Sequence, residues 1–176
     1  MSTLKVENLT GITSGSNANK IIVPAGQTLD ASAATLVPDA GYNIQCQQYY
    51  NSQTASVTTT STSFVASGIA KSITPKYSNS LIIIQSNISM AYATNWMNVR
   101  MYLNGSALPN TGDYSVGYID HGYNVYSALT FNGQYQASST SALNFEIYYR
   151  SSTSSDTAYI THVNASAALT LWEIKQ

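Results

Sequence analysis

Residues 110–126, NTGDYSVGYIDHGYNVY, hold the side chains of this sequence that are best suited to chemistry. Three glycines interrupt the stretch, so we expect long loops that expose rigid ring faces. Tyrosine rings can stack on the faces of sugars, and carboxylate and imidazole groups can hydrogen-bond sugar hydroxyls. The stretch therefore predicts a shallow glycan-binding site, with a nearby tryptophan as a further stacking platform. The alternative is that these rings pack between sheets or subunits. The candidate residues are Trp96, Asp113, Tyr114, Tyr118, Asp120, His121 and Tyr123.

The same stretch contains two carboxylates, Asp113 and Asp120, which could act as a pair in glycoside cleavage. Sequence gives them no fixed separation, and solvated loop residues are the simpler interpretation. Asp120, His121 and His162 lack any metal-ligand spacing. We expect no enzyme, no cofactor and no metal site. The single cysteine, Cys46, excludes an internal disulfide framework and is expected to pack as a small apolar residue.

Composition indicates a folded, uncharged polar protein. Only 9% of the 176 residues are charged, against roughly 25% in an ordinary globular domain. Disordered chains avoid aromatic and apolar residues, whereas this chain is 44% hydrophobic and has 14 tyrosines. The net charge of −1 and the scattered basic residues argue against a nucleic-acid partner. No apolar run or basic-then-apolar start predicts membrane insertion or a secretory signal.

The elements that must position the candidate residues are β-strands. In residues 81–90 the apolar side chains Ile82, Ile84, Ile88 and Met90 alternate with polar ones, which is the period of a strand. Asn104-Gly105 and Asn132-Gly133 each follow an alternating segment and predict tight reversals. The hydroxyl-rich residues 53–60 predict an outer strand, because threonine packs well on a pleated surface. We expect an all-β fold, an antiparallel sandwich or jelly roll of seven to nine strands, over residues 42–176.

Residues 1–41 form a different segment, with short apolar pieces separated by Gly, Pro and Ser and no aromatic residue before Tyr42. Each piece is too short to bury its own apolar side, so the same segment of a neighbouring chain is the expected partner. This predicts an extended attachment and oligomerisation segment. Its contact residues would be Leu4, Val6, Ile21, Ile22, Val23, Leu29, Leu36 and Val37.

Three blocks of the sequence resemble fibre-like virion proteins of tailed phages of marine bacteria, cyanophages included. The blocks are MSTLKVENLTG, then SVTTTSTSFVASGIAKSITPKYSNSLIIIQSNIS, and the C-terminal SSDTAYITHVNASAALTLWEIKQ. Residues 93–127, which include most candidate site residues, show no such match.

The resemblance implies a non-enzymatic structural protein, assembled in the host cytoplasm and displayed on the particle. It implies a homotrimer whose N-terminal segment joins other virion proteins and whose β head faces outward, toward a host glycan or outer-membrane receptor. Two alternatives stay open: a capsid decoration protein that clips onto the shell through its N-terminal arm, and a free lectin-like domain.

Overall fold

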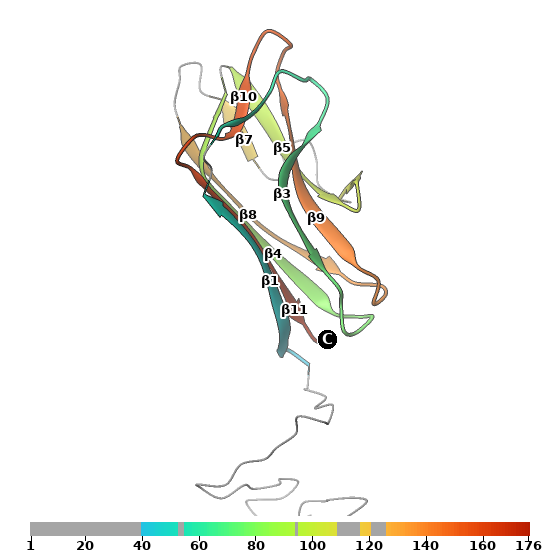
Figure 1. Ribbon diagram of the computed structural model, residues 1–176. Helices are drawn as coiled ribbons and strands as arrows, with labels where there is room; N and C mark the ends of the chain where they lie inside the picture. The colour runs from blue at the N-terminus through green and yellow to red at the C-terminus, as the bar shows by residue number, and fades with distance from the viewer. Residues whose placement is uncertain (1–39, 53–54, 94, 109–116, 121–125) are drawn as a thin grey trace, which may run out of the picture. The chain divides into compact units, whose positions relative to one another are not determined.

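The computed structural model describes residues 40–52, 55–93, 95–108, 117–120 and 126–176. They belong to the second of two units, Pro38–Gln176. Within the described part the chain is all-β, and two antiparallel sheets pack face to face, which confirms the predicted sandwich (Figure 1). The strands are β1 (Asn43–Ser52), β2 (Val57–Thr59), β3 (Val65–Ile73), β4 (Leu81–Ala93), β5 (Trp96–Leu103), β6 (Ser106–Ala107), β7 (Gly117–Asp120), β8 (Ser127–Gln136), β9 (Leu143–Ser151), β10 (Ala158–Thr161) and β11 (Ser166–Ile174).

Strands that follow one another along the chain often lie in different sheets. The first sheet has the order β1-β11-β4-β10-β2, with β8 also paired to β4. The second has the order β3-β9-β5-β6, with β7 also paired to β5. The chain crosses from one sheet to the other between β3 and β4 and again between β4 and β5, as in a jelly roll.

Period-2 patterning decides which side chains fill the core between the sheets. The three predicted isoleucines of β4 are fully buried, whereas Gln85 and Asn87 point outward. β9 alternates in the same way, with Leu143, Phe145 and Ile147 buried. Because both sheets contribute such a face, their apolar side chains form one contiguous core. The side chain of Met90 and the eight predicted attachment residues, which all precede residue 40, lie outside the described residues.

Both ends of the described unit lie together, at what we call the proximal pole. The Gly41 N–H donates to the Lys175 carbonyl (2.7 Å), and the Lys175 N–H donates to the Tyr42 carbonyl (3.0 Å). β1 then runs antiparallel to β11 toward the opposite end, the distal pole, where β10 and β7 lie (Figure 1). The segment that precedes residue 40 is therefore joined to the sandwich at the end remote from β10.

Of the two predicted Asn-Gly reversals, one is present and the other is not. Asn104 and Gly105 have φ of 50° and 79° and connect β5 to β6, so the first Asn-Gly reversal is confirmed. Asn132-Gly133 is not a turn, because both residues are extended in β8 and pair with β4. The Phe131 ring covers Gly133 so closely that a Cβ there would lie 2.5 Å from its Cζ.

Three further expectations need correction. The hydroxyl-rich strand is shorter than predicted, since β2 spans only Val57–Thr59. Eleven strands are described instead of seven to nine, because β6 and β7 have only two and four residues and were too short to be recognised as strands. Cys46 is exposed on the outer side of β1 instead of packed inside, because it lies opposite the outward-facing Trp172. Among the described residues, no helix could span a bilayer.

Candidate receptor-binding surface

The predicted site residues are only partly placed by the structure. Trp96 is half-buried at the start of β5, and β7 brings Asp120 opposite Trp96 and Tyr118 opposite Asn98. Three of the seven candidates are therefore neighbours along one strand pair at the distal pole. The other four, Asp113, Tyr114, His121 and Tyr123, lie outside the described residues.

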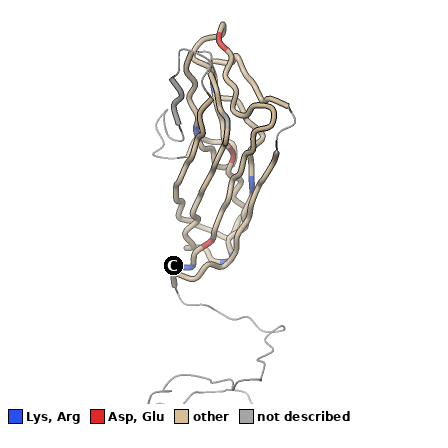
Figure 2. The backbone as a smooth tube through the Cα atoms, turned by 90° about the vertical axis from the view of Figure 1, so that its left-hand side faces the viewer, with Lys and Arg blue, Asp and Glu red and all other residues tan. Residues whose placement is uncertain are grey.

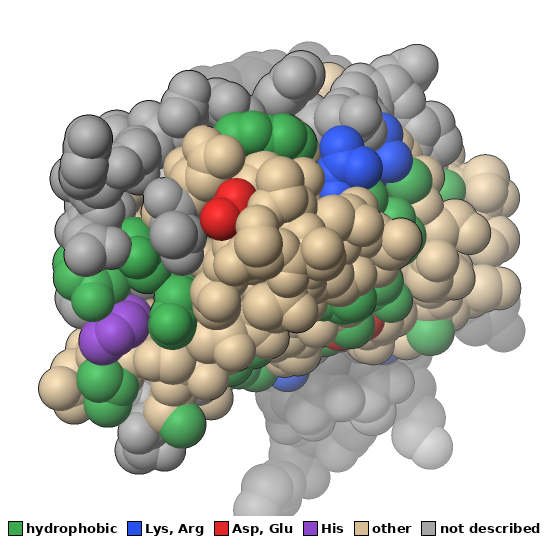
Figure 3. All heavy atoms as spheres, turned by 90° about the horizontal axis from the view of Figure 1, so that it is seen from above, with side chains coloured by type: hydrophobic (Ala, Val, Ile, Leu, Met, Phe, Trp, Pro, Cys, Tyr) green, Lys and Arg blue, Asp and Glu red, His purple; other side chains and the backbone are tan. Residues whose placement is uncertain are grey.

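A ring cluster that sequence reasoning missed lies at the same pole, and we call it the distal cluster. It consists of Tyr92, Tyr126, Tyr159 and His162. Tyr92 lies 5.5 Å from Tyr126 and 5.0 Å from Tyr159 between ring centroids. His162 closes the circuit, 4.9 Å from Tyr126 in an edge-on arrangement and 6.1 Å from Tyr159. Figure 3 looks onto this pole and shows a histidine, in purple, among hydrophobic side chains in green.

Strand register explains why these rings meet. Tyr92 on β4 and Tyr159 on β10 are direct cross-strand partners, and Tyr126 precedes β8, whose Ser127 lies opposite Ala91. Tyr92 points outward only because the β4–β8 ladder shifts register between Ile88 and Ala91. Such a bulge moves the following residues to the other face of the sheet. Ala91 and Ala93 are accordingly buried, and the tyrosine between them reaches the surface.

The distal cluster is partly exposed and able to hydrogen-bond. Tyr126 is 48% exposed, and its hydroxyl lies 3.2 Å from Nε2 of His162. The imidazole Nδ1 lies 3.3 Å from the Val163 carbonyl. Tilted rings with polar tips at a rim offer both apolar faces and hydroxyl partners, which is what a saccharide requires.

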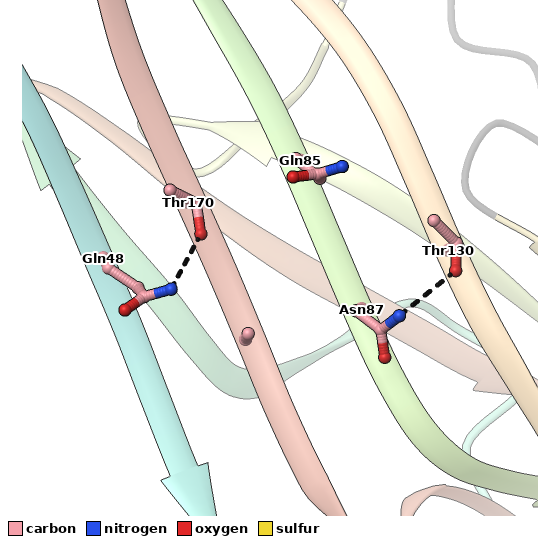
Figure 4. Close-up of a pocket in the computed structure, with 6 residues that line it drawn as sticks. Gln48, Gln85, Asn87, Thr130 and Thr170 are labelled. Carbon is pink, nitrogen blue, oxygen red and sulfur yellow. Dashed lines mark hydrogen bonds between the residues drawn. The ribbon is translucent and has the colours of Figure 1, made fainter.

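A polar depression lies on the outer surface of the same sheet. It has a volume of about 250 Å³ and is lined by Gln48, Gln85, Asn87, Thr130, Ala168 and Thr170 (Figure 4). Gln48 Nε2 donates to Thr170 Oγ1 (3.2 Å), and Asn87 Nδ2 lies 3.5 Å from Thr130 Oγ1. Pockets for small ligands usually have volumes of about 300–1,000 Å³, so the volume of this depression is below the usual range.

The second sheet presents a different, charged surface. Phe64 lies beneath the guanidinium groups of Arg100 (5.3 Å) and Arg150 (4.9 Å), and Tyr102 stacks on Tyr148 at 3.9 Å. Charged residues are few along the described backbone (Figure 2). Of the residues that the structure describes, no three His, Cys, Asp or Glu side chains form a group able to hold a metal ion.

The sequence pointed to only one member of the distal cluster, Tyr126, which ends the aromatic stretch of residues 110–126. The rings of the cluster come from three separate segments, which hold Tyr92, Tyr126 and the pair Tyr159 and His162. His162, considered above only as a metal ligand, follows the last residue of β10 and contacts two tyrosines. Only knowledge of the β4–β10 and β4–β8 registers would have brought these residues together.

Comparisons with known proteins leave the family open. No protein-family model matches the chain, and no curated protein matches it. A solved structure described as the EclA C-terminal domain, a sugar-binding protein, aligns with 98% of this chain and 97% of that chain. The alignment has 15% sequence identity and a TM-score of 0.34, which is too weak a likeness to carry an argument about function.

Proposed function

We propose that this chain is a non-catalytic, fibre-like structural protein of a tailed-phage virion, and that its head binds a host-surface glycan through the distal cluster. The virion setting and a homotrimeric assembly rest on the sequence resemblance. In this proposal the N-terminal segment joins other virion proteins, and the head is displayed on the particle surface.

The observation that carries the proposal is the separation of the two poles. The chain enters the head beside Lys175, whereas β10 lies at the other end (Figure 1), together with the exposed Tyr126 and the half-buried His162 that follows β10. A head attached through its N-terminal segment would therefore present the distal cluster outward. Each head would bind weakly, and several tethered heads would bind strongly because the second contact has a high effective concentration.

The first experiment measures binding of the full-length chain to a panel of immobilised neutral and acidic oligosaccharides at low density. We expect Tyr126→Ala and Tyr159→Ala each to weaken binding about two- to tenfold. This follows because an aromatic contact contributes roughly 0.5–1.5 kcal/mol and 1.4 kcal/mol is tenfold in affinity. Tyr42→Ala is the matched control, since Tyr42 is 61% exposed but lies at the proximal pole.

Two results would count against the proposal. Absence of binding to any sugar, and to host cells, would favour a capsid decoration protein with a passive head. Sugar binding that is equal in the wild type, the two cluster variants and the control would keep a lectin-like function but move its site away from the distal cluster.

A further inference from the structure

We propose that the outer face of β1, β11, β4 and β8, which we call the neutral face, is where copies of this chain pack against one another. The inference concerns a surface other than the distal cluster, and it does not depend on glycan binding.

The first argument is the distribution of charge. β1, β4 and β8 contain no charged residue, and the only one in β11, Glu173, is fully buried on the core side. The other sheet places Arg100, Glu146 and Arg150 in its strands β5 and β9. Protein surfaces that stay in water carry interspersed charges, whereas the centres of interfaces are depleted in them. Charge depletion confined to one sheet of the described head therefore indicates a covered face.

The second argument is chemical self-complementarity. The middle of the neutral face is made of amides and hydroxyls, including Gln48, Gln85 and Thr130 (Figure 4). Amide and hydroxyl groups each donate and accept hydrogen bonds. Donors and acceptors on one copy can therefore meet acceptors and donors on the next copy, both across a twofold axis and around the threefold axis of a trimer. A face of like charges could not do so.

The third argument is the apolar content around this polar centre. Trp172 and Ile83 are half-buried partners in one row across β11 and β4, toward the proximal pole. Tyr50, which is 66% exposed, lies on β1 toward the other end of the face. Aromatic residues are enriched at interfaces and give them much of their contact area. A second copy would cover these side chains.

The size of the face decides how much of it a partner must use. Strands lie about 4.8 Å apart and rise about 3.3 Å per residue, so four strands over eight residues span a plane of roughly 500 Å². Stable interfaces hide about 800 Å² of accessible surface per partner. Protruding side chains make the accessible area larger than that of the plane. Even so, the face reaches about 800 Å² only if a partner covers nearly all of it, so a charge near its centre should disrupt the contact.

The test combines the solution mass of the full-length chain with the reactivity of its single thiol. Cys46 is exposed on the neutral face of one subunit, so a maleimide should label it rapidly unless another copy covers it. We expect the solution mass of the wild type to be twice the 18.9 kDa of one chain or a higher multiple of it. We also expect at least tenfold slower labelling of Cys46 in the native wild type than in the denatured chain.

The informative variant is Gln85→Lys, which places a charge at the exposed centre of the face. We expect it to label about tenfold faster than the wild type, even if the N-terminal segment still holds the copies together. Thr130→Lys on β8 repeats the test on another strand, in case the first variant does not fold. The matched control is Ser72→Lys, an exposed position on β3 of the other sheet, which should leave mass and labelling unchanged.

Several outcomes would overturn the inference. One is a monomeric wild type, and another is an oligomer whose Cys46 labels as fast as in the denatured chain. A third is an effect of Gln85→Lys on oligosaccharide binding without any change in mass or thiol labelling, which would make the neutral face a ligand site instead.

Discussion

At the scale of single residues, the buried carboxylate of Glu173 is the most constrained charged group in the described head. Its Oε1 accepts hydrogen bonds from Ser80 Oγ (2.6 Å) and from the backbone N–H groups of Lys76 (2.7 Å) and Tyr77 (3.2 Å). Its Oε2 accepts one from Gln45 Nε2 (2.7 Å). Together these bonds fasten the loop between β3 and β4 to the ends of β1 and β11.

These contacts set the protonation of Glu173. Burial alone would raise the pKa of Glu173, but the hydrogen bonds from Ser80, Gln45 and the two backbone N–H groups outweigh it, and the pKa lies below its ordinary value of 4.5. A lowered folded-state pKa means that ionised Glu173 stabilises the fold above pH 4.5. That stability is lost as pH falls through the lower, folded-state pKa.

Glu173→Gln should therefore destabilise the head by about 2 kcal/mol at pH 7, because a neutral amide accepts these buried hydrogen bonds more weakly than the carboxylate does. The measurement is urea unfolding of the wild type and the variant at pH 7 and at pH 3.5. We expect the two proteins to differ less at pH 3.5, because the stability that ionised Glu173 provides declines as pH falls below 4.5 toward the lower folded-state pKa. An equal difference at both pH values would show that the charge of Glu173 does not stabilise the fold.

At the scale of elements, the two Asn-Gly pairs show how far local sequence decides structure. Asn104-Gly105 turns because the following strand, β6, returns against β5, and Asn104 is also held by β9. The Asn104 N–H donates to the Asn144 carbonyl (2.9 Å), and the Asn144 N–H donates to Asn104 Oδ1 (2.8 Å). Asn132-Gly133 has the same dipeptide but stays extended, because β4 pairs with it along its whole length.

Gly105→Ala should lower stability by about 1 kcal/mol, since a side chain must then adopt the left-handed backbone conformation. In a domain of this size that corresponds to a decrease in Tm of roughly 2–4 °C. Calorimetry or thermal circular dichroism measures it, with the neighbouring exposed position as control, as Ser106→Ala. Similar Tm values for the two variants would indicate that the turn does not need glycine.

Strands could be predicted from the sequence where every second side chain is buried. The alternation of β4 and of β9 identified core residues correctly because each strand buries one face in a single core. The bulge in β4 was not predictable, because it results from pairing with β8 and leaves no mark in the local sequence. The outward position of Tyr92 depends on that bulge, and the distal cluster was missed for this reason.

At the scale of the whole molecule, the second unit has a contiguous hydrophobic core of its own, to which both of its sheets contribute. A chain that begins at residue 40 should therefore keep the circular dichroism spectrum and thermal transition of the full-length protein. Light scattering should show that it associates more weakly if residues 1–39 contribute contacts between copies. Loss of the thermal transition would contradict an autonomous head, and unchanged association would place the contacts in the head alone.

The fold class followed from composition and patterning, because a chain with few charges, many hydroxyls and alternating apolar residues can bury its surface as stacked sheets. The candidate site followed only in part, because binding residues gather by tertiary pairing. Trp96, Tyr118 and Asp120 share the β5–β7 pair, whereas Tyr126 and His162 join β8 and β10 at one pole. Sequence indicated which residue types to examine, and strand register decided which of them met.

The antiparallel pairing of β1 and β11 has a mechanical consequence. Tension applied between residue 40 and a ligand held at the distal pole would run lengthwise along β1. β1 is paired with β11 from Asn43 to Ser52, and ladder hydrogen bonds lie perpendicular to the strands. The pull would therefore strain these bonds together in shear instead of opening them one after another from an end. A head connected in this way should resist a pull between residue 40 and the distal pole. It should resist this pull far better than a force that separates the neighbouring ends of β1 and β11 at the proximal pole.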